Sequence, residues 1–378
     1  MRGVAGRRQL SGDRASHHAR ARSHAGVARD TVRNRLPAYN LSRPRYPVPS
    51  PLFAYGLVLA GAFGVALLTT LLMYRFALRH GLLDVPNERS AHVVPTPHGG
   101  GIAIAAAFFF SLALLLWWDV LPRDAGMALL GGGLLVAAVG AWDDHRHVAP
   151  PWRLLVHVLA ALWALFWLGA DLSAFDALLA LLGMVWLINL YNFMDGIDGL
   201  AGAQALCAAL AGGVLLWLSD APGLALASMA LAVSSAGFLV WNWPPAKIFM
   251  GDAGSGLLGY SFAVLALAGA QSGALSALIW LILLAPFVLD ATLTLLRRML
   301  RGERWYQAHA THLYQRMTQA GYSHKQVTMA VIVLNVALLW GLAAWVWRHD
   351  ELAVHAVSVA GMAGAAMWVY LQIRMTIK

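Results

Sequence analysis

The stretch 177–202, ALLALLGMVWLINLYNFMDGIDGLAG, joins a long apolar run to a cluster of amide and carboxylate side chains. The run over 174–193 is long enough to cross the hydrocarbon core of a bilayer, which is roughly 30 Å thick. Asn189, Asn192 and Asp195 follow at i, i+3 and i+6, on one side of the helix where it would leave the membrane. Carboxylates beside hydrocarbon are costly and are usually functional. The stretch therefore predicts a membrane helix with a polar site at its end.

The chain as a whole is strongly apolar. Of its 378 residues 60% are hydrophobic and only 12% are charged, and the mean hydropathy is +0.63. A chain of this composition is too apolar for a soluble domain, and in lipid its backbone must satisfy its own hydrogen bonds. We predict an all-α polytopic integral membrane helix bundle of about eleven transmembrane helices. The predicted spans are 52–76, 99–118, 125–142, 152–169, 174–193, 203–219, 222–241, 255–271, 274–296, 327–347 and 352–373.

The loops between these spans differ strongly in charge. Counted from the first helix, the odd loops and the C-terminus hold fourteen Lys and Arg, whereas the even loops hold only Arg123 and Arg348. Because basic loops stay in the cytoplasm, the odd loops are expected to face it. The polar motifs all fall in odd loops, at 77–98, 143–151, 194–202, 242–254 and 297–326. We therefore expect an active site built from cytoplasmic loops.

Residues 1–50 carry the whole net charge of the chain. They hold eleven Arg and two Asp, a balance of +9, whereas residues 51–378 balance to zero. We expect a disordered basic tail ahead of a membrane-embedded domain at 51–378. The basic residues follow no pattern, so no nucleic-acid partner is expected. The orientation above would export the tail, and a start codon assigned too far upstream would remove this conflict.

Two further clusters accompany the first one. Asp143 and Asp144 directly follow a predicted span, and their mutual repulsion raises at least one pKa, which suits proton transfer. The stretch 241–256, WNWPPAKIFMGDAGSG, carries Asp252 in a Gly-rich turn that opens the next helix. Helix N-termini favour phosphate, and carboxylate and amide oxygens suit Mg²⁺. The acidic clusters thus predict a magnesium and diphosphate site, with Asn242 and Phe249 as candidates for contact with a base.

Two basic loops offer further partners for an anion. The loop at 83–101 holds Asp84, Arg89, His92 and His98, and the loop at 297–317 holds several Arg together with His309 and His312. Positive charge near a membrane surface suits lipid headgroups or a nucleotide diphosphate. His309 and His312 have a zinc-like spacing, but no Cys or third ligand stands nearby, so contact with phosphate or sugar is the favoured interpretation.

Five motifs occur together in one order. They are PNERSAHVVPTPHGGG (86–101), WDDHRHV (142–148), NLYNFMDGIDGLAG (189–202), WNWPPAKIFMGDAGSG (241–256) and HATHLYQRM (309–317). Over roughly 52–373 the chain resembles the polyprenyl-phosphate N-acetylhexosamine-1-phosphate transferases. That family includes the phospho-N-acetylmuramoyl-pentapeptide transferases and the bacterial enzymes that initiate O-antigen or enterobacterial common antigen. The last motif, together with PNERSAH, looks more like the antigen branch.

The resemblance implies roles for individual residues. Asn192 and Asp252 match the positions that bind Mg²⁺, with Mn²⁺ as an alternative ion. Asp143 and Asp144 match the positions that serve the acceptor phosphate, one of them as proton acceptor. Asp195 matches an acid with a less well defined role. The remaining matches are Asp198, Asn242 and Phe249 for uridine, and His309 and His312 for the diphosphate-linked sugar.

The reaction implied is transfer of a sugar-1-phosphate from a UDP-N-acetylhexosamine to undecaprenyl phosphate, with release of UMP. The resemblance further implies a multi-pass enzyme of the bacterial cytoplasmic membrane, a lipid-bilayer environment, a role in O-antigen or related cell-envelope polysaccharide synthesis, and a homodimer. Direct attack by the lipid phosphate is preferred to a covalent route through an Asp.

Three alternatives stay open. A muramoyl-pentapeptide transferase would use a different UDP-sugar, and a lipid-phosphate phosphatase would release inorganic phosphate. A proton-coupled transporter would place carboxylates near the middle of the membrane. Only Asp290 lies clearly inside a predicted span, and it has an equally good interpretation as an ion-pair partner of the nearby Arg297 and Arg298.

Overall fold

The computed structural model describes residues 51–86, 94–303 and 310–377, so the predicted tail at 1–50 lies outside the described residues. The described helices are α2 (Pro51–His80), α3 (Gly101–Trp117), α4 (Arg123–His145), α5 (Pro150–Leu168), α6 (Ala174–Phe193), α7 (Leu200–Leu218), α8 (Pro222–Asn242), α9 (Asp252–Gln271), α10 (Ala277–Leu283), α11 (Ala285–Leu300), α12 (Leu313–Gln319), α13 (His324–Leu334), α14 (Trp340–Arg348) and α15 (Ala353–Ile377). Strands β1 (Leu83–Asp84) and β2 (Thr96–Pro97) form a short antiparallel pair.

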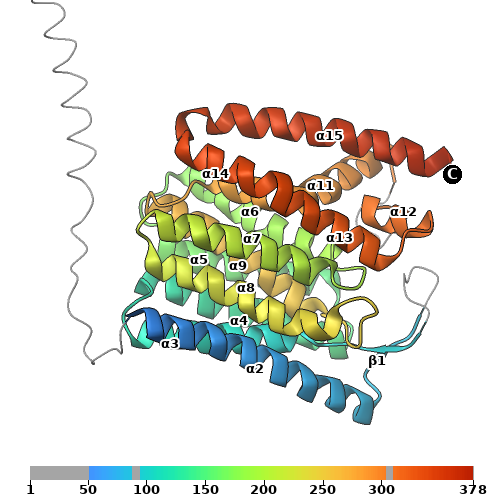
Figure 1. The fold of residues 1–378 in the computed structure, drawn as a ribbon, viewed down its shortest axis with the longest axis horizontal. Helices are drawn as coiled ribbons and strands as arrows, with labels where there is room; N and C mark the ends of the chain where they lie inside the picture. Colours follow the sequence, from blue (N-terminus) through green and yellow to red (C-terminus); the bar gives the residue numbers. More distant parts are fainter. Residues whose placement is uncertain (1–50, 87–93, 304–309, 378) are drawn as a thin grey trace, which may run out of the picture. The chain divides into compact units, whose positions relative to one another are not determined.

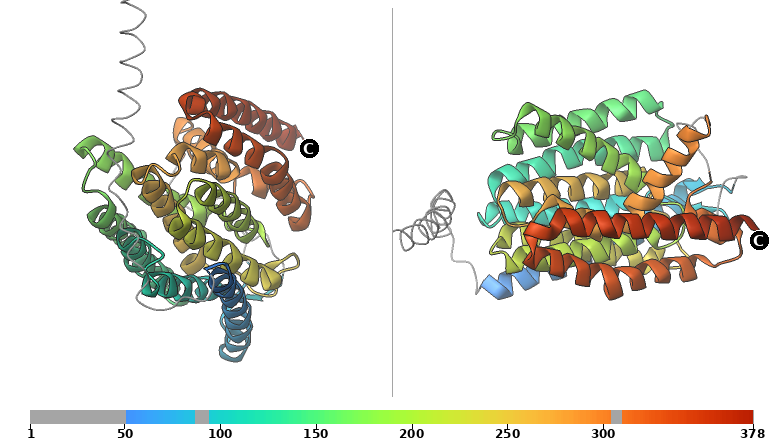
Figure 2. Two further views of the ribbon diagram at one scale, coloured as in Figure 1. Left: turned by 60° about the vertical axis from the view of Figure 1, so that its left-hand side comes forward. Right: turned by 90° about the horizontal axis from the view of Figure 1, so that it is seen from above.

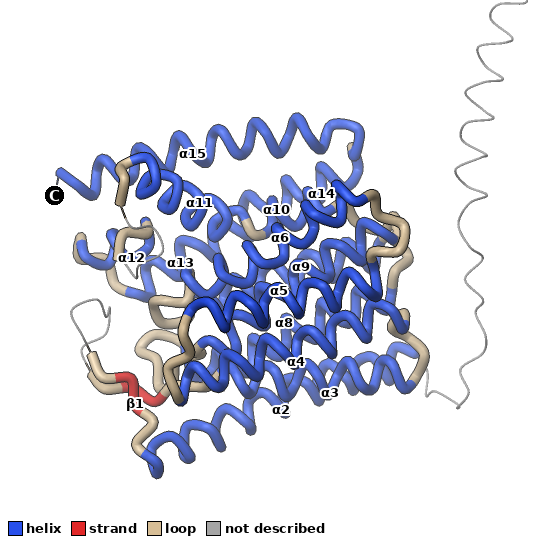
Figure 3. The backbone as a smooth tube through the Cα atoms, turned by 180° about the vertical axis from the view of Figure 1, so that it is seen from behind, coloured by secondary structure: helices blue, strands red, loops and turns tan. Residues whose placement is uncertain are grey.

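The long helices run side by side, with their connecting loops at the two ends of the bundle (Figure 1). Helix α9 packs on α3, α4, α5, α6, α7 and α8, and 83% of its most apolar window is buried, against 22% for α2 and 11% for α15. Helices α2 and α15 accordingly lie at opposite edges of the bundle (Figure 2). The strand pair and α12 lie at the same end (Figure 3).

The polytopic helical fold predicted from the sequence is confirmed. Within the described residues nine helices are long and apolar enough to cross a membrane, or ten if one bent pair counts as a span. Helices cover most of each of the eleven predicted spans. The span predicted at 99–118 corresponds to α3, which has only 17 residues. The span predicted at 255–271 begins earlier, at Asp252, and so reaches 20 residues.

The span predicted at 274–296 is broken. Helices α10 and α11 meet at an angle of 82°. Pro286 stands in the first turn of α11, where its missing N–H is tolerated, but it cannot continue α10. The carbonyl of Leu283, at the break, accepts a hydrogen bond of 2.8 Å from the buried amide of Gln204. Asn335 in turn donates to Gln204 at 2.8 Å, so a polar chain satisfies the interrupted backbone.

Small residues let α9 approach its neighbours closely. A Cβ atom at Gly259 would lie 2.4 Å from the carbonyl oxygen of Leu187 and 2.8 Å from Cα of Ile188, both on α6. Helices in membranes associate largely through such close packing, because lipid offers no hydrophobic driving force between them. The position of α9 therefore depends on small side chains.

Gly259→Ala is expected to lower the free energy of unfolding by about 1–3 kcal/mol, because the new methyl group would meet backbone that no rotamer change can move. The measurement is the melting temperature of the purified protein in detergent. Gly183→Ala on α6 is the control, since no atom lies within 4 Å of its Cβ position. Equal melting temperatures for the two variants would contradict the close approach of α6 and α9.

Candidate active site

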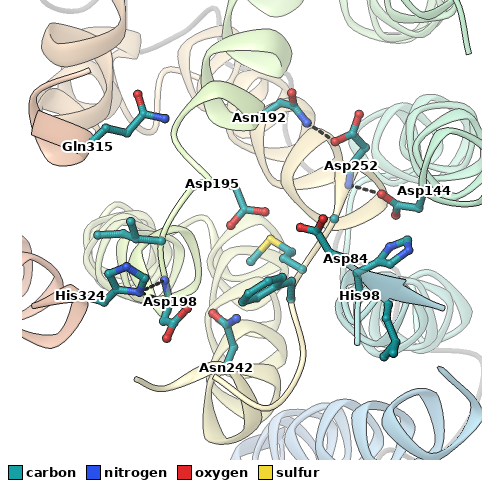
Figure 4. A pocket seen from close by; sticks show the side chains of 16 residues that line it. Asp84, His98, Asp144, Asn192, Asp195, Asp198, Asn242, Asp252, Gln315 and His324 are labelled. Carbon is teal, nitrogen blue, oxygen red and sulfur yellow. Dashed lines mark hydrogen bonds and ion pairs between the residues drawn. The ribbon is translucent and has the colours of Figure 1, made fainter. Parts of the chain in front are cut away.

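All five odd loops contribute to one open cavity of about 510 Å³ at one end of the bundle. Figure 4 shows its polar side chains converging from different helices. The lining residues are Leu83, Asp84, His98, Asp144, Asn192, Asp195, Gly196, Ile197, Asp198, Asn242, Phe249, Met250, Gly251, Asp252, Gln315 and His324. Five of these are aspartates, so the cavity is lined mainly by acceptors of hydrogen bonds and by negative charge.

Asp144 joins the end of α4 to the start of α9. Its carboxylate accepts hydrogen bonds from the backbone N–H groups of Asp252, at 2.8 Å, and Ala253, at 3.4 Å. Gly251 makes this approach possible, because its φ is +79° and a Cβ there would lie 2.6 Å from both carboxylate oxygens of Asp144. The carboxylate thus caps the positive N-terminus of α9 and directs Asp252 toward the cavity.

The carboxylate of Asp252 is held from two sides. The amide of Asn192 donates to Oδ1 at 2.7 Å, and Nη1 of Arg153 donates to Oδ2 at 2.8 Å. The same Nη1 donates to Asp143 at 2.5 Å, and Val148 N–H donates to Asp143 at 2.6 Å. Asp143 contacts Asp252 through this shared cation and is not among the residues that line the cavity.

Arg153 is a site residue that the sequence analysis counted only as a loop charge. It lies near the start of α5, ten positions after Asp143. The available signal was a cation placed at the edge of an apolar span close to an acidic pair, since such a charge needs a partner. The distance to Asp252, ninety-nine positions away, could not be read from the chain.

Asp195 points into the middle of the cavity (Figure 4). No described residue donates a side-chain or backbone hydrogen bond to its carboxylate. Burial, followed by the charges of Asp252 and Asp144, raises the pKa of Asp195 to about 8. The carboxylates of Asp144, Asp195 and Asp252 line the same cavity with few cations nearby, and this arrangement favours the binding of a positive ion.

Asp198 and Asn242 tie the loops of the cavity together. The amide of Asn242 accepts from Gly199 N–H and donates to the carbonyl of Ile248, each at 2.9 Å. Asp198 accepts from Ala246 N–H at 3.0 Å, and its carboxylate lies 3.2 Å from Nδ1 of His324. Both residues were predicted to contact uridine, and both line the cavity. The amide of Asn242, however, already forms hydrogen bonds within the protein. Their contact with a base stays a prediction.

Phe249 lines the same part of the cavity. Its backbone is held on both sides, because its N–H donates to the carbonyl of Pro97 at 2.8 Å and its carbonyl accepts from Gly100 N–H at 2.9 Å. The β2 segment therefore determines where the ring lies.

Of the two histidines predicted to contact the sugar, only one lies among the described residues. His309 lies outside the described residues. His312 is 2% exposed, and its ring stacks on those of Phe193 and Tyr314, with centroids 6.4 and 5.9 Å away. Burial lowers the pKa of His312 to about 4, so the ring is neutral near pH 7. The ring does not line the cavity, and the same loop instead contributes Gln315.

The basic residues of this loop are largely engaged with protein partners. Arg298 lies 2.8 Å from Glu303, and Arg297 and Arg316 both donate to Gln372 on α15. Asp290 accepts from Leu313 N–H at 2.8 Å and, among the described residues, forms no ion pair with these arginines. Asp290 therefore caps α12, which differs from both interpretations of this residue offered by the sequence.

The donor set fits Mg²⁺ better than a metal held by protein alone. In the part of the chain that the structure describes, no group of three or more His, Cys, Asp or Glu is arranged to hold a metal ion. Mg²⁺ takes one or two protein oxygens and completes its shell with water and substrate phosphates. Asp252 and the unpartnered Asp195 supply hard oxygens of that kind, so the residues present fit this ion.

Comparison with known proteins agrees with this architecture. Residues 126–270 match the family model of glycosyl transferase family 4. The probable undecaprenyl-phosphate N-acetylglucosaminyl 1-phosphate transferase of Bacillus subtilis is 29% identical over 316 residues, which cover 74% of this chain and 86% of that protein. The decaprenyl-phosphate N-acetylglucosaminephosphotransferase of Mycobacterium tuberculosis is 30% identical over 336 residues, 76% of this chain and 82% of that protein.

A third relative comes from another group of bacteria. The undecaprenyl-phosphate alpha-N-acetylglucosaminyl 1-phosphate transferase of Salmonella typhimurium is 28% identical over 307 residues, 75% of this chain and 82% of that protein. The chain belongs to glycosyl transferase family 4 and is a multi-pass membrane protein. The family resemblance drawn from the motifs is confirmed.

Asn242→Ala is expected to lower the free energy of unfolding by about 2 kcal/mol or more without any ligand, because it leaves two buried backbone groups unpaired. The measurement is the melting temperature in nucleotide-free buffer. Asn189→Ala is the matched control, since its amide donates to Val185 in its own helix. If Asn242 only contacted a nucleotide, the melting temperature would not change.

Asp195→Asn is expected to raise the melting temperature in the presence of a chelator. The pKa of about 8 in the folded protein exceeds the value of about 3.9 in an unfolded chain, so the wild type loses stability as the pH rises between these values. The gain from the substitution should therefore grow toward pH 8 and then level off. Asp198→Asn is the control and should destabilise, because that carboxylate has partners. A gain that does not change between pH 5.5 and 8.5 would contradict this account.

Proposed function

We propose that the protein transfers an N-acetylhexosamine-1-phosphate from a UDP-sugar to a polyprenyl phosphate, undecaprenyl phosphate in the first instance, and releases UMP. The observation that carries the proposal is the convergence of five aspartates on one open cavity at the helix ends, in a chain of this family. Two polyanionic substrates can enter such a cavity only if a divalent cation offsets the charge. The names of the relatives state the same class of reaction.

The donor would occupy the cavity with its uridine beside Phe249 and Asp198. Mg²⁺, or alternatively Mn²⁺, would be held by Asp252 and Asn192, with Asp195 facing it. When bound, the ion would neutralise the diphosphate and stabilise charge on the leaving uridylate. Asp144 supports this arrangement indirectly, because it fixes the backbone from which Asp252 projects.

The acceptor phosphate would approach from the side of α4 and α5, where Arg153 offers a cation beside Asp143. A phosphate monoester has a second pKa of about 6 and is mostly dianionic at neutral pH, so little proton transfer is needed. Both carboxylate oxygens of Asp144 accept backbone N–H groups of α9, and Asp143 is paired with Arg153, so both carboxylates are engaged within the protein. This supports direct attack by the lipid phosphate, with rate enhancement from positioning and charge screening.

The membrane placement completes the proposal. The excess of Lys and Arg in the odd loops supports a cavity that faces the cytoplasm, in the bacterial cytoplasmic membrane. The product would be the first lipid-linked sugar of a cell-envelope polysaccharide such as O-antigen. A homodimer is a further part of this proposal.

The test uses the full chain purified in detergent with undecaprenyl phosphate, MgCl₂ and a panel of UDP-sugars. UMP release with UDP-N-acetylglucosamine or another UDP-N-acetylhexosamine is the expected result. Turnover only with UDP-MurNAc-pentapeptide would show the muramoyl-pentapeptide reaction instead. Release of inorganic phosphate without UMP would show a phosphatase. No chemical turnover with any of these donors would refute the proposal.

Asp252→Ala is expected to reduce UMP release by at least about 100-fold at saturating Mg²⁺, because it removes a carboxylate that would hold the ion. Chelation of the wild-type enzyme should have the same effect, and added Mg²⁺ should reverse it. Asp176→Ala is the control, since this exposed residue lies in the first turn of α6. Near-normal activity of Asp252→Ala would exclude a metal-binding role.

A further inference from the structure

Helix α12 is fixed rigidly beside the cavity. The carboxylate of Asp290 accepts from the N–H groups of Leu313, at 2.8 Å, and Tyr314, at 3.3 Å. Trp368 of α15 also donates to this carboxylate, at 3.0 Å. The hydroxyl of Tyr314 donates to the carbonyl of Phe193, at the end of α6, at 3.0 Å. Side chains of α12 that face the cavity therefore have a defined position relative to the acidic loop after α6.

Gln315 is the residue of α12 that lines the cavity. Its Oε1 accepts from the backbone N–H of His312 at 3.2 Å, which determines the orientation of the side-chain amide. Nε2 consequently points away from the helix and toward the cavity, as Figure 4 shows. No described residue accepts a hydrogen bond from Nε2.

The other two side-chain amides of the cavity both donate hydrogen bonds to protein acceptors. Asn192 donates to Asp252 at 2.7 Å and to Ser255 at 3.1 Å. Asn242 donates to the carbonyl of Ile248 at 2.9 Å. The five aspartates of the lining only accept hydrogen bonds when ionised. Among the described lining residues, Gln315 is thus the side-chain amide that keeps both of its N–H groups for a ligand.

We propose that Gln315 recognises the acetamido group of the donor sugar, with Nε2 donating a hydrogen bond to the acetamido carbonyl oxygen. The inference rests on the proposed function, since it assumes a UDP-N-acetylhexosamine in the cavity. An acetamido carbonyl needs a donor, whereas sugar hydroxyls can be bound by the carboxylates. Gln315 takes the role that the sequence suggested for His312, whose ring is buried away from the cavity.

The test compares Gln315→Met with wild type in UMP-release assays with UDP-N-acetylglucosamine. Met keeps the length of the side chain but donates no hydrogen bond. The KM for UDP-N-acetylglucosamine should rise about 10-fold, the effect of one lost hydrogen bond. Inhibition constants for UMP and for UDP-glucose, which lack the acetamido group, should not change. Gln315→Asn should recover part of the loss. Gln319→Met, on the exposed side of α12, is the matched control.

Each outcome has a separate meaning. If Gln315→Met weakens UMP, UDP-glucose and UDP-N-acetylglucosamine equally, the residue acts only through the structure of the loop and the inference is wrong. If no constant changes, Gln315 does not contact the sugar and the inference is equally wrong. If the wild-type protein itself releases no UMP from any UDP-N-acetylhexosamine, the proposed function fails, whatever the variants do.

Discussion

The hydrogen bonds from the first N–H groups of α9 to the carboxylate of Asp144 connect the end of α4 to the start of α9. They require a glycine at 251, since any other side chain would collide with the carboxylate. They also place Asp252 where Asn192 and Arg153 reach its two oxygens. Helix α9 is the most enclosed of the long helices, so its N-terminus cannot shift without moving the neighbouring helices. The packing of the bundle core therefore fixes the relative positions of the acidic side chains.

The charge of the cavity determines which ligands can enter it. Five aspartates line it, and within the described lining the basic groups are two histidines. Arg153, which is not a lining residue, offsets part of this charge, but it is shared between Asp143 and Asp252. Asp195, with no hydrogen-bond donor among the described residues, keeps a proton near neutral pH until a cation replaces it. An anionic donor and an anionic acceptor can meet here only together with a positive ion.

The loop before α13 illustrates how packing changes a role suggested by a motif. Its two histidines are the conspicuous residues of the segment 309–317, yet His312 belongs to an aromatic stack and does not line the cavity. Gln315, which no pattern marked, is brought to the cavity by the helical turn that follows. That turn depends on Asp290, a buried carboxylate from α11 that caps α12. The break at Pro286 gives α11 the direction needed for this contact.

The sequence by itself determined the class of fold, the helical segments and the grouping of the polar motifs on alternate loops. Hydropathy over about twenty residues and the distribution of Lys and Arg are local properties, and a bilayer permits few backbone solutions. It also marked Asp252, Asn192 and Asp195, because acids and amides at the edge of an apolar run are rare. Only the tertiary structure decided which residues meet. Helix packing and hydrogen bonds between residues far apart in the chain determine three features of the site. They are the pairing of Arg153 with Asp252, the burial of His312 and the position of Gln315 at the cavity. No periodicity along the sequence records such contacts.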